Sequence, residues 1–192
     1  MELSEVTGKN AKAVKAIYHA AFPKEERMPF WTMRLLAKMP TTQLLAFYEG
    51  GTLCGFAYVG LGEKVAFLMF LAVDQASRSQ GHGSAILQAL RERYPHHKHL
   101  VSIELCGEGV PNREQRLRRK AFYLRNSYQE TGWQITLSKL PQEVLVANGD
   151  FSPPRAAGLF PNLQQPHHEP APGTNQIKKA KELLLQNEFS VS

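Results

Sequence analysis

One stretch constrains the fold of this chain more than any other: a strand-like run that leads through a short polar loop into a helix. Residues 64–73 form a continuous run rich in apolar residues, Val and Phe among them, which indicates a strand rather than a helix. The loop after it ends at Gly81 and Gly83, and an apolar stripe from Ile86 to Leu90 then repeats at helical spacing until Pro95. This order of elements places the chain among proteins that combine strands and helices in one fold.

The rest of the first 147 residues also alternates between helical and strand patterns. We expect helices over residues 10–22, 29–38, 83–94 and 112–126, the last with Leu117, Ala121 and Leu124 on one side. We expect strands over residues 43–48, 52–59, 64–73, 100–106, 129–137 and 143–147. The pair Gly50-Gly51 between the first two strands signals a hairpin. The predicted fold class is α/β, with a mixed sheet and helices packed on it.

Proline placement separates this compact region from a tail. The chain has 192 residues, and six of its 12 prolines fall between residues 148 and 175. We therefore predict a domain over residues 1–147, a Pro/Gly-rich linker or irregular tail over 148–173, and a C-terminal helix over 174–189. That helix either docks on its own domain, pairs with a second copy in a homodimer, or stays loose.

Composition excludes several classes of protein. Hydrophobic residues make up 43% of the chain, but no stretch approaches the roughly 20 apolar residues that a membrane helix needs, so no membrane partner is expected. The acidic start lacks the basic-then-apolar order of a signal peptide. Cys54 and Cys106 sit in apolar surroundings and indicate buried thiols in a reducing, cytoplasmic location. The histidines at 96–99 and 167–168 have no carboxylate or cysteine at ligand spacing, so we expect no metal.

The loop before the third helix has the features of an anion site. The first turn of a helix presents unpaired N–H groups and the positive end of the helix dipole. Gly81 and Gly83 let an anion approach the backbone, and Arg78 adds a positive charge. These features fit a pyrophosphate site, although a Gly-x-Gly pair also fits a plain tight turn. The loop lacks the Lys-Ser/Thr ending of the nucleotide P-loop and the third glycine of the dinucleotide fingerprint.

The same segment resembles the acyl-CoA signature of the GNAT acetyltransferase superfamily. Leu71-x-Val73 precedes Arg78-x-x-Gly81-x-Gly83 at the family's spacing, and the order of elements matches over about residues 2–147. The resemblance implies a mostly antiparallel central sheet with flanking helices, and acetyl-CoA as co-substrate. It also implies that loop N–H groups hold the CoA pyrophosphate and that a strand backbone pairs with the pantetheine arm. The residues concerned are Arg78, Ser79, Gln80, Gly81, His82, Gly83 and Ser84 for the pyrophosphate, and Leu71, Ala72 and Val73 for the arm.

A second segment resembles the family's other motif, Tyr-x-x-x-Gly-Phe. Tyr123 takes the place of the motif's tyrosine, while Ser127-Tyr128 replaces Gly-Phe. The resemblance implies that Tyr123 donates a proton to the departing thiolate and that Phe122 lies with the cofactor. Without the first motif, Tyr123 would be interpreted as a half-buried core aromatic.

The implied reaction is direct attack of an amine on the thioester of acetyl-CoA, and it needs a base. Glu104 is one candidate, because the strand period places it opposite the apolar residues of its strand. The alternative interpretation of Glu104 is a surface residue or a buried ion-pair member. Glu25 and Glu26 are further candidates, in a loop that borders the acceptor site in the family. We place Glu26 and Phe30 at the acceptor site.

Positive charge is in excess, with 23 Lys and Arg against 17 Asp and Glu, a net charge of +6 that suggests an anionic partner. Arg116, Arg119 and Lys120 stand at helical spacing with Tyr123, so they share one helical face. This stripe either holds a phosphate of CoA, with Arg119 as a contact, or is a solvated face. The lack of interleaved aromatic residues argues against a third interpretation, a nucleic-acid contact.

The sequence thus predicts a cytoplasmic N-acetyltransferase. It moves the acetyl group of acetyl-CoA to a primary amine of a small molecule or peptide within a ternary complex. The alternative is a non-catalytic acyl-CoA-binding sensor or interaction module of the same fold. The acceptor itself is not predicted, because one fold serves many different amines.

Overall fold

The fold is built on one twisted sheet, seen in a computed structural model that describes residues 1–137, 140–151 and 163–164. Within these residues the sheet has eight strands in the order β1-β2-β3-β4-β5-β7-β6-β8. The strands are β1 (Glu2–Glu5), β2 (Thr42–Glu49), β3 (Thr52–Leu61), β4 (Val65–Val73), β5 (Lys98–Glu104), β6 (Gln129–Leu137), β7 (Leu140–Ala147) and β8 (Leu163–Gln164). Neighbouring strands are antiparallel except β4 and β5, which are parallel. The predicted mixed, mostly antiparallel sheet is confirmed.

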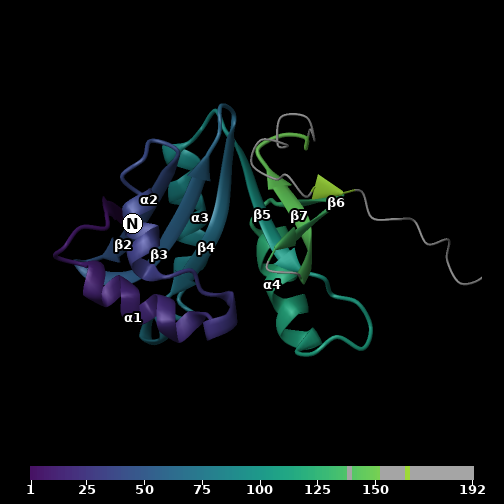
Figure 1. Ribbon diagram of the computed structural model, residues 1–192, viewed down its shortest axis with the longest axis horizontal. Helices are drawn as coiled ribbons and strands as arrows, with labels where there is room; N and C mark the ends of the chain where they lie inside the picture. The colour runs from purple at the N-terminus through teal and green to yellow at the C-terminus, as the bar shows by residue number, and fades with distance from the viewer. Residues whose placement is uncertain (138–139, 152–162, 165–192) are drawn as a thin grey trace, which may run out of the picture.

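In the described part of the chain, four α-helices cover the two faces of the sheet (Figure 1). They are α1 (Ala11–Ala21), α2 (Phe30–Leu36), α3 (His82–Arg93) and α4 (Arg113–Arg125), with 3-10 turns at Lys24–Glu26 and Gln75–Ser77. The side chains of β2 alternate between the faces: Leu44 packs with α1 and α2, and Leu45 packs with α3. None of the helices in the described residues is long and apolar enough to cross a bilayer.

Most of the predicted elements are present within a few residues of their expected ends. The sequence pattern missed β1 because its four residues include only one apolar side chain, Leu3. It also missed the two-residue strand β8, which pairs with β6. The helix expected over 174–189 and most of the linker expected over 148–173 lie outside the described residues.

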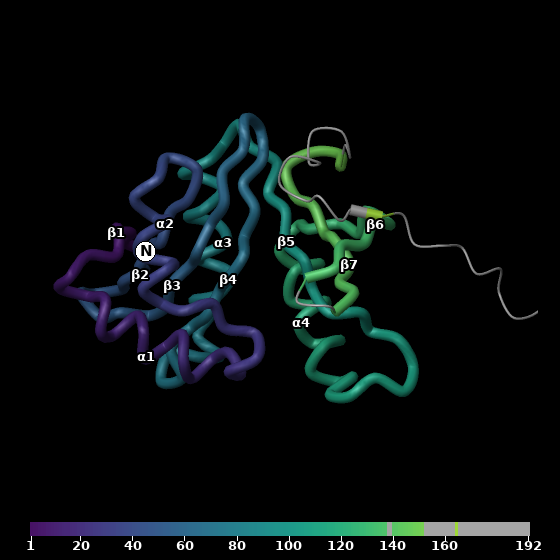
Figure 2. Tube along the Cα trace, viewed as in Figure 1, coloured from purple at the N-terminus to yellow at the C-terminus, as the bar shows by residue number. Residues whose placement is uncertain are grey.

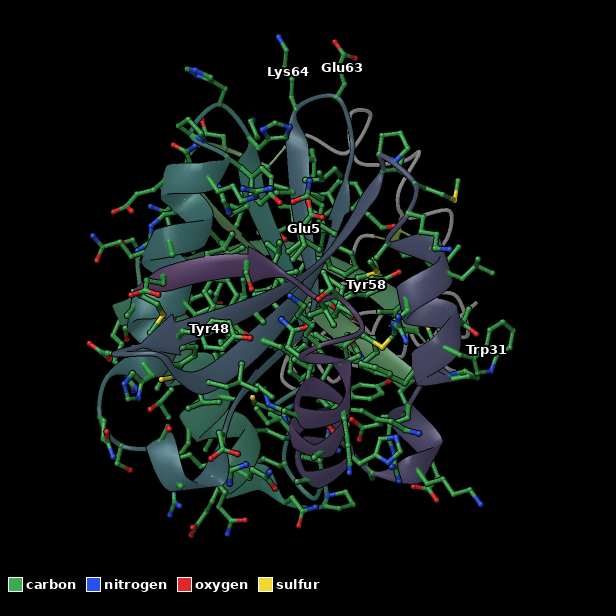
Figure 3. All side chains as sticks on the ribbon, turned by 90° about the vertical axis from the view of Figure 1, so that its left-hand side faces the viewer. Glu5, Trp31, Tyr48, Tyr58, Glu63 and Lys64 are labelled. Atoms are coloured by element: carbon green, nitrogen blue, oxygen red, sulfur yellow. The ribbon has the colours of Figure 1, made fainter. Side chains whose placement is uncertain are left out.

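Several exposed side chains lie at the periphery of the fold (Figure 3). Trp31 projects from α2 away from the sheet and is 69% exposed. Glu63 and Lys64 mark the tip of the hairpin between β3 and β4. Tyr58 of β3, by contrast, is fully buried between the sheet and α1 and α2.

The sheet divides where β4 and β5 diverge, which Figure 2 shows as two halves that open away from each other. These strands pair only from Val65 to Leu68 on β4. The next residue, Met69, is a bulge: Tyr58 faces Phe70 and Val59 faces Leu68, so Met69 has no counterpart on β3. A bulge bends a strand and increases its local twist. Beyond it, β4 continues with β3 while β5 continues with β7.

Candidate active site

A cleft of about 290 Å³ lies where β4 and β5 diverge. Its walls come from the end of α1, β4, the loop before α3, β5 and α4. It is lined by Ala21, Phe22, Leu68, Met69, Leu71, Ala72, Val73, Arg78, Val101, Ser102, Ile103, Gln115, Arg119 and Tyr123. Six of these residues were predicted for the site from the sequence: Leu71, Ala72, Val73, Arg78, Arg119 and Tyr123. A larger hollow of about 650 Å³ beside β1 and the end of α2 contains none of the predicted residues.

The edge of β4 that faces the cleft has an open backbone. On its other edge, Leu71 pairs with Ala57 and Val73 with Gly55 of β3. Toward β5, pairing stops at Leu68 in the described part of the chain. The backbone groups that follow on this edge are therefore available to an extended amide-containing chain.

The loop between β4 and α3 presents a row of unpaired amides. The N–H groups of residues 79–84 donate no hydrogen bond within the described residues. At the start of the loop, directly after β4, the Asp74 carboxylate accepts a hydrogen bond from the Ala76 N–H at 3.1 Å. Successive open N–H groups at a helix N-terminus form a concave site of positive potential. Binding of a pyrophosphate by this loop stays a prediction.

The two glycines of this loop serve different purposes. Gly81 caps α3 with φ of 82°, a left-handed conformation that favours glycine, and a Cβ there would meet nothing within 4 Å. At Gly83 a Cβ would lie 3.1 Å from two ring atoms of Phe122. Gly83 therefore permits close packing of α3 on α4. Phe122, predicted to lie with the cofactor, packs here and does not line the cleft.

The ring of His82 joins this loop to β2. It is buried, with Nδ1 2.8 Å from the Ser77 carbonyl and Nε2 2.6 Å from the Glu49 carboxylate. A carbonyl oxygen only accepts, so Nδ1 carries a proton and donates it to Ser77. The hydrogen bond to Ser77 is the largest cause that raises the pKa of His82, and Glu49 raises it further. From the sequence, only a backbone role was expected for His82, and this side-chain contact was not anticipated.

Tyr123 is buried at the cleft. Its ring packs edge-on against Phe122 and Tyr128, with centroid distances of 5.1 and 5.3 Å. Burial raises the pKa of Tyr123 to about 12, with Arg119 opposing the rise. The hydroxyl makes no hydrogen bond to any described residue. Tyr123 is therefore a neutral phenol whose hydroxyl proton is not donated to any described residue.

The basic stripe of α4 faces the sheet, where it is neutralised. Arg119 donates to one Glu104 oxygen at 2.9 Å, and Arg116 lies 3.3 Å from the other. Lys120 contacts Glu143 at 2.8 Å and Glu130 at 2.7 Å. Three cations thus meet three carboxylates, so the stripe is paired with the sheet. Arg119 also lines the cleft, with its side chain 38% exposed, and its contact with a phosphate of CoA stays a prediction. The apolar stripe of α4 faces outward instead, with Leu117, Ala121 and Leu124 exposed.

The acidic candidates differ sharply in their surroundings. Glu104 is a part-buried ion-pair member, with both oxygens against guanidinium groups. The carboxylate of Glu26, in the 3-10 turn after α1, makes no hydrogen bond or ion pair with any described residue. Partial burial, and then repulsion from Glu104, raise the pKa of Glu26. Arg119 and Arg116 oppose the rise.

The remaining predicted acceptor residue lies elsewhere. Phe30 is only 8% exposed and packs with Tyr18 in the core between α1, α2 and the sheet. Phe22 and Met69, which line the cleft directly, were not predicted from the sequence. Phe22 follows the last turn of α1, and Met69 is the bulge. Neither position carries a pattern that separates it from an ordinary core residue.

The chain belongs to the acetyltransferase (GNAT) family, whose model matches residues 11–125. It is therefore an acyltransferase, of a family that uses acetyl-CoA. A search of curated proteins finds no match.

Solved structures share the fold at low sequence identity. An acetyltransferase of the GNAT family from Bacteroides thetaiotaomicron is 18% identical, with a TM-score of 0.68 over 82% of this chain and 92% of that one. A ribosomal-protein-S18-alanine N-acetyltransferase from Escherichia coli is 15% identical, with a TM-score of 0.59 over 79% and 95%. An aminoglycoside 6′-N-acetyltransferase complexed with coenzyme A is 14% identical, with a TM-score of 0.58 over 76% and 96%.

Proposed function

We propose that this protein transfers the acetyl group of acetyl-CoA to a primary amine by direct attack within a ternary complex. One observation carries the proposal. The open edge of β4 and Tyr123 line one cleft, and Arg78, which precedes the unpaired amides of residues 79–84, lines it as well. This arrangement suits a long molecule with a phosphate at one end, amides in the middle and a reactive group at the other end.

The residues fit acetyl-CoA in three places. The N–H groups of residues 79–84, with the Arg78 side chain, would hold the pyrophosphate. Arg78 makes no ion pair with any described residue, so its charge is free for this contact. The cleft-facing backbone of Leu71 to Val73 would pair with the pantetheine amides. When bound, the thioester supplies an activated acetyl group.

Acetyl transfer then needs three groups from the chain. These are a hydrogen-bond donor to the developing oxyanion, a proton donor to the leaving sulfur and a base for the acceptor ammonium. A backbone N–H of the open β4 edge donates to the oxygen that becomes negative during attack. Tyr123 donates its proton to the leaving sulfur, because its pKa, raised by burial, keeps the phenol protonated at neutral pH. The acceptor ammonium must lose a proton before it can attack.

We assign that proton to Glu26 rather than Glu104. Both oxygens of Glu104 are engaged by arginines, so they are less accessible to an acceptor amine. Glu26 has no such partner among the described residues, and its raised pKa makes it a better base. Glu104 then acts as a positioning residue that holds Arg119 at the cleft. The base takes the proton directly or through one water.

The acceptor class is a small-molecule or peptide amine, and the compartment we propose is the cytoplasm. The free thiols of Cys54 and Cys106 support a reducing compartment. Neutralisation of the α4 stripe removes the main support for a nucleic-acid partner.

Thiol release from acetyl-CoA, measured over a panel of small amines and peptides, tests the proposal. We expect amine-dependent release, and a large fall in kcat for Tyr123→Phe with acetyl-CoA binding retained by calorimetry. Tyr128→Phe, which alters the neighbouring buried phenol, is the matched control. Binding without amine-dependent release would instead support the non-catalytic acyl-CoA module. Absence of acetyl-CoA binding would contradict both.

A further inference from the structure

A cluster of three side chains of the kinds that bind metal ions lies outside the cleft, beside the loop between β4 and α3. Glu49 ends β2, Cys54 lies at the start of β3, and His82 begins α3. One carboxylate oxygen, the Cys54 sulfur and a ring nitrogen of His82 all lie within 4.8 Å of one another. We propose that these residues form a binding site for a divalent metal ion of the zinc class.

The ligand set indicates which metals would bind. Thiolate sulfur, imidazole nitrogen and carboxylate oxygen together match zinc and its neighbours, whereas Mg²⁺ and Ca²⁺ favour oxygen ligands alone. Three protein ligands leave a fourth position for water. Glu49 is 62% exposed on its side chain, so solvent and an ion reach the cluster from its side.

His82 is already oriented as a metal ligand would be. Its Nδ1 donates to the Ser77 carbonyl at 2.8 Å, which directs Nε2 toward Glu49. A metal-bound histidine characteristically donates its other N–H to a carbonyl or carboxylate, and this contact sets the ring's orientation. The ring is buried, so this orientation is held by packing as well.

Cys54 supplies the second enclosed ligand. It is 2% exposed, and its thiol donates to the Thr52 carbonyl at 3.3 Å. Metal binding replaces the S–H proton of Cys54 and the Nε2–H proton of His82, so two protons leave as the ion enters. The 2.6 Å contact between His82 and Glu49 then lengthens to about 3.3 Å, the ligand spacing around a tetrahedral ion. Rotation of the exposed Glu49 side chain allows this change.

The site would connect two parts of the fold that are far apart in the sequence. Glu49 and Cys54 flank the hairpin between β2 and β3, while His82 belongs to the loop that presents the amides of residues 79–84. A bound ion would therefore hold this loop against the hairpin. The sequence analysis expected no metal, so this combination of residues was not predicted.

Cobalt binding to the full-length, untagged, reduced chain tests the proposal. Co²⁺ reports its ligands, because a thiolate ligand produces an intense charge-transfer band in the near ultraviolet. We expect one equivalent of Co²⁺ to produce this band and Zn²⁺ to displace it. Cys54→Ser should abolish the band, while Cys106→Ser, which changes the chain's other cysteine, should leave it unchanged.

Glu49→Gln provides a second variant with little risk to folding, because the residue is exposed. We expect its Zn²⁺ affinity, measured by competition with a chromophoric chelator, to fall by about tenfold or more. Zn²⁺ should raise the thermal midpoint of the wild-type chain but not that of Cys54→Ser. No band at stoichiometric Co²⁺, or a band that persists in Cys54→Ser, would overturn the proposal. These readouts do not depend on acetyl transfer.

Discussion

Glu26 and Glu104 show how much the surroundings of a carboxylate decide what it can do. Both were candidates for the base on sequence grounds. Two guanidinium groups contact Glu104, while the Glu26 carboxylate has no hydrogen-bond or ion-pair partner among the described residues. A carboxylate whose two oxygens are held by guanidinium groups is less accessible to an acceptor amine. This contrast is why we propose Glu26 as the base.

The pH dependence of turnover should report Glu26. Its raised pKa means that it gains a proton, and ceases to act as a base, at a higher pH than an ordinary glutamate. We expect kcat/KM to fall as pH drops through that pKa. Glu26→Gln should remove this acidic limb and lower kcat/KM by about 100-fold or more.

Glu25→Gln is the matched control, since it changes a neighbouring exposed glutamate in the same 3-10 turn. Its pH profile should match that of the wild type. If Glu104→Gln removes the acidic limb while Glu26→Gln keeps it, the base is Glu104 and our assignment is wrong.

Gly83 is a packing residue, and this can be measured. A leucine there would press on the Phe122 ring, because even a Cβ at residue 83 would lie 3.1 Å from that ring. We expect Gly83→Leu to lower the free energy of unfolding by about 1–3 kcal/mol in urea denaturation. In a Phe122→Ala background the loss should be smaller, because the obstruction is gone. An equal loss in both backgrounds would contradict this role.

Helix α4 illustrates an element whose two faces are reversed from the usual pattern. Surface helices commonly turn their apolar stripe to the core and their charges to solvent. Here Leu117 and Leu124 are exposed, while Arg116, Arg119 and Lys120 face the sheet. The reason lies in the neighbouring strands, which present Glu104, Glu130 and Glu143 to this face.

The ion pairs of α4 should therefore contribute to stability unequally. Lys120 has a side chain only 20% exposed; burial would lower its pKa, but its hydrogen bonds to Glu130 and Glu143 raise it. We expect Lys120→Met to reduce the free energy of unfolding by about 1–3 kcal/mol at neutral pH. Arg118→Met, in an exposed pair with Glu114, should cost about 0.5 kcal/mol or less. Equal losses in urea denaturation would contradict the inward orientation of α4.

The molecule as a whole is organised around the divergence of β4 and β5. The bulge at Met69 and the end of pairing at Leu68 leave a strand edge open in the middle of the sheet. The cleft that results touches α1, β4, β5 and α4, so a ligand in it contacts both halves of the sheet. Such a ligand should stabilise the domain as one unit.

Acetyl-CoA should raise the thermal midpoint of the protein. At a concentration 100 times its Kd, binding adds about 2.7 kcal/mol, which corresponds to a rise of roughly 5–10 °C for a domain of this size. Arg78→Ala should reduce the rise at a fixed concentration, because it removes a positive charge from the loop at the cleft. An unchanged midpoint at saturating acetyl-CoA would contradict a site in this cleft.

Local patterns in the sequence were sufficient to predict most helices and strands and to locate the loop of residues 78–84. Periodicity, glycine positions and the order of strand, loop and helix are properties of neighbouring residues, so they can be recognised without a structure. The pairing of Glu104 with two arginines, the isolation of Glu26 and the meeting of Glu49, Cys54 and His82 were decided by the tertiary structure. These contacts join segments distant in the chain. Their geometry depends on how the sheet diverges and how α4 is turned, which no local pattern records.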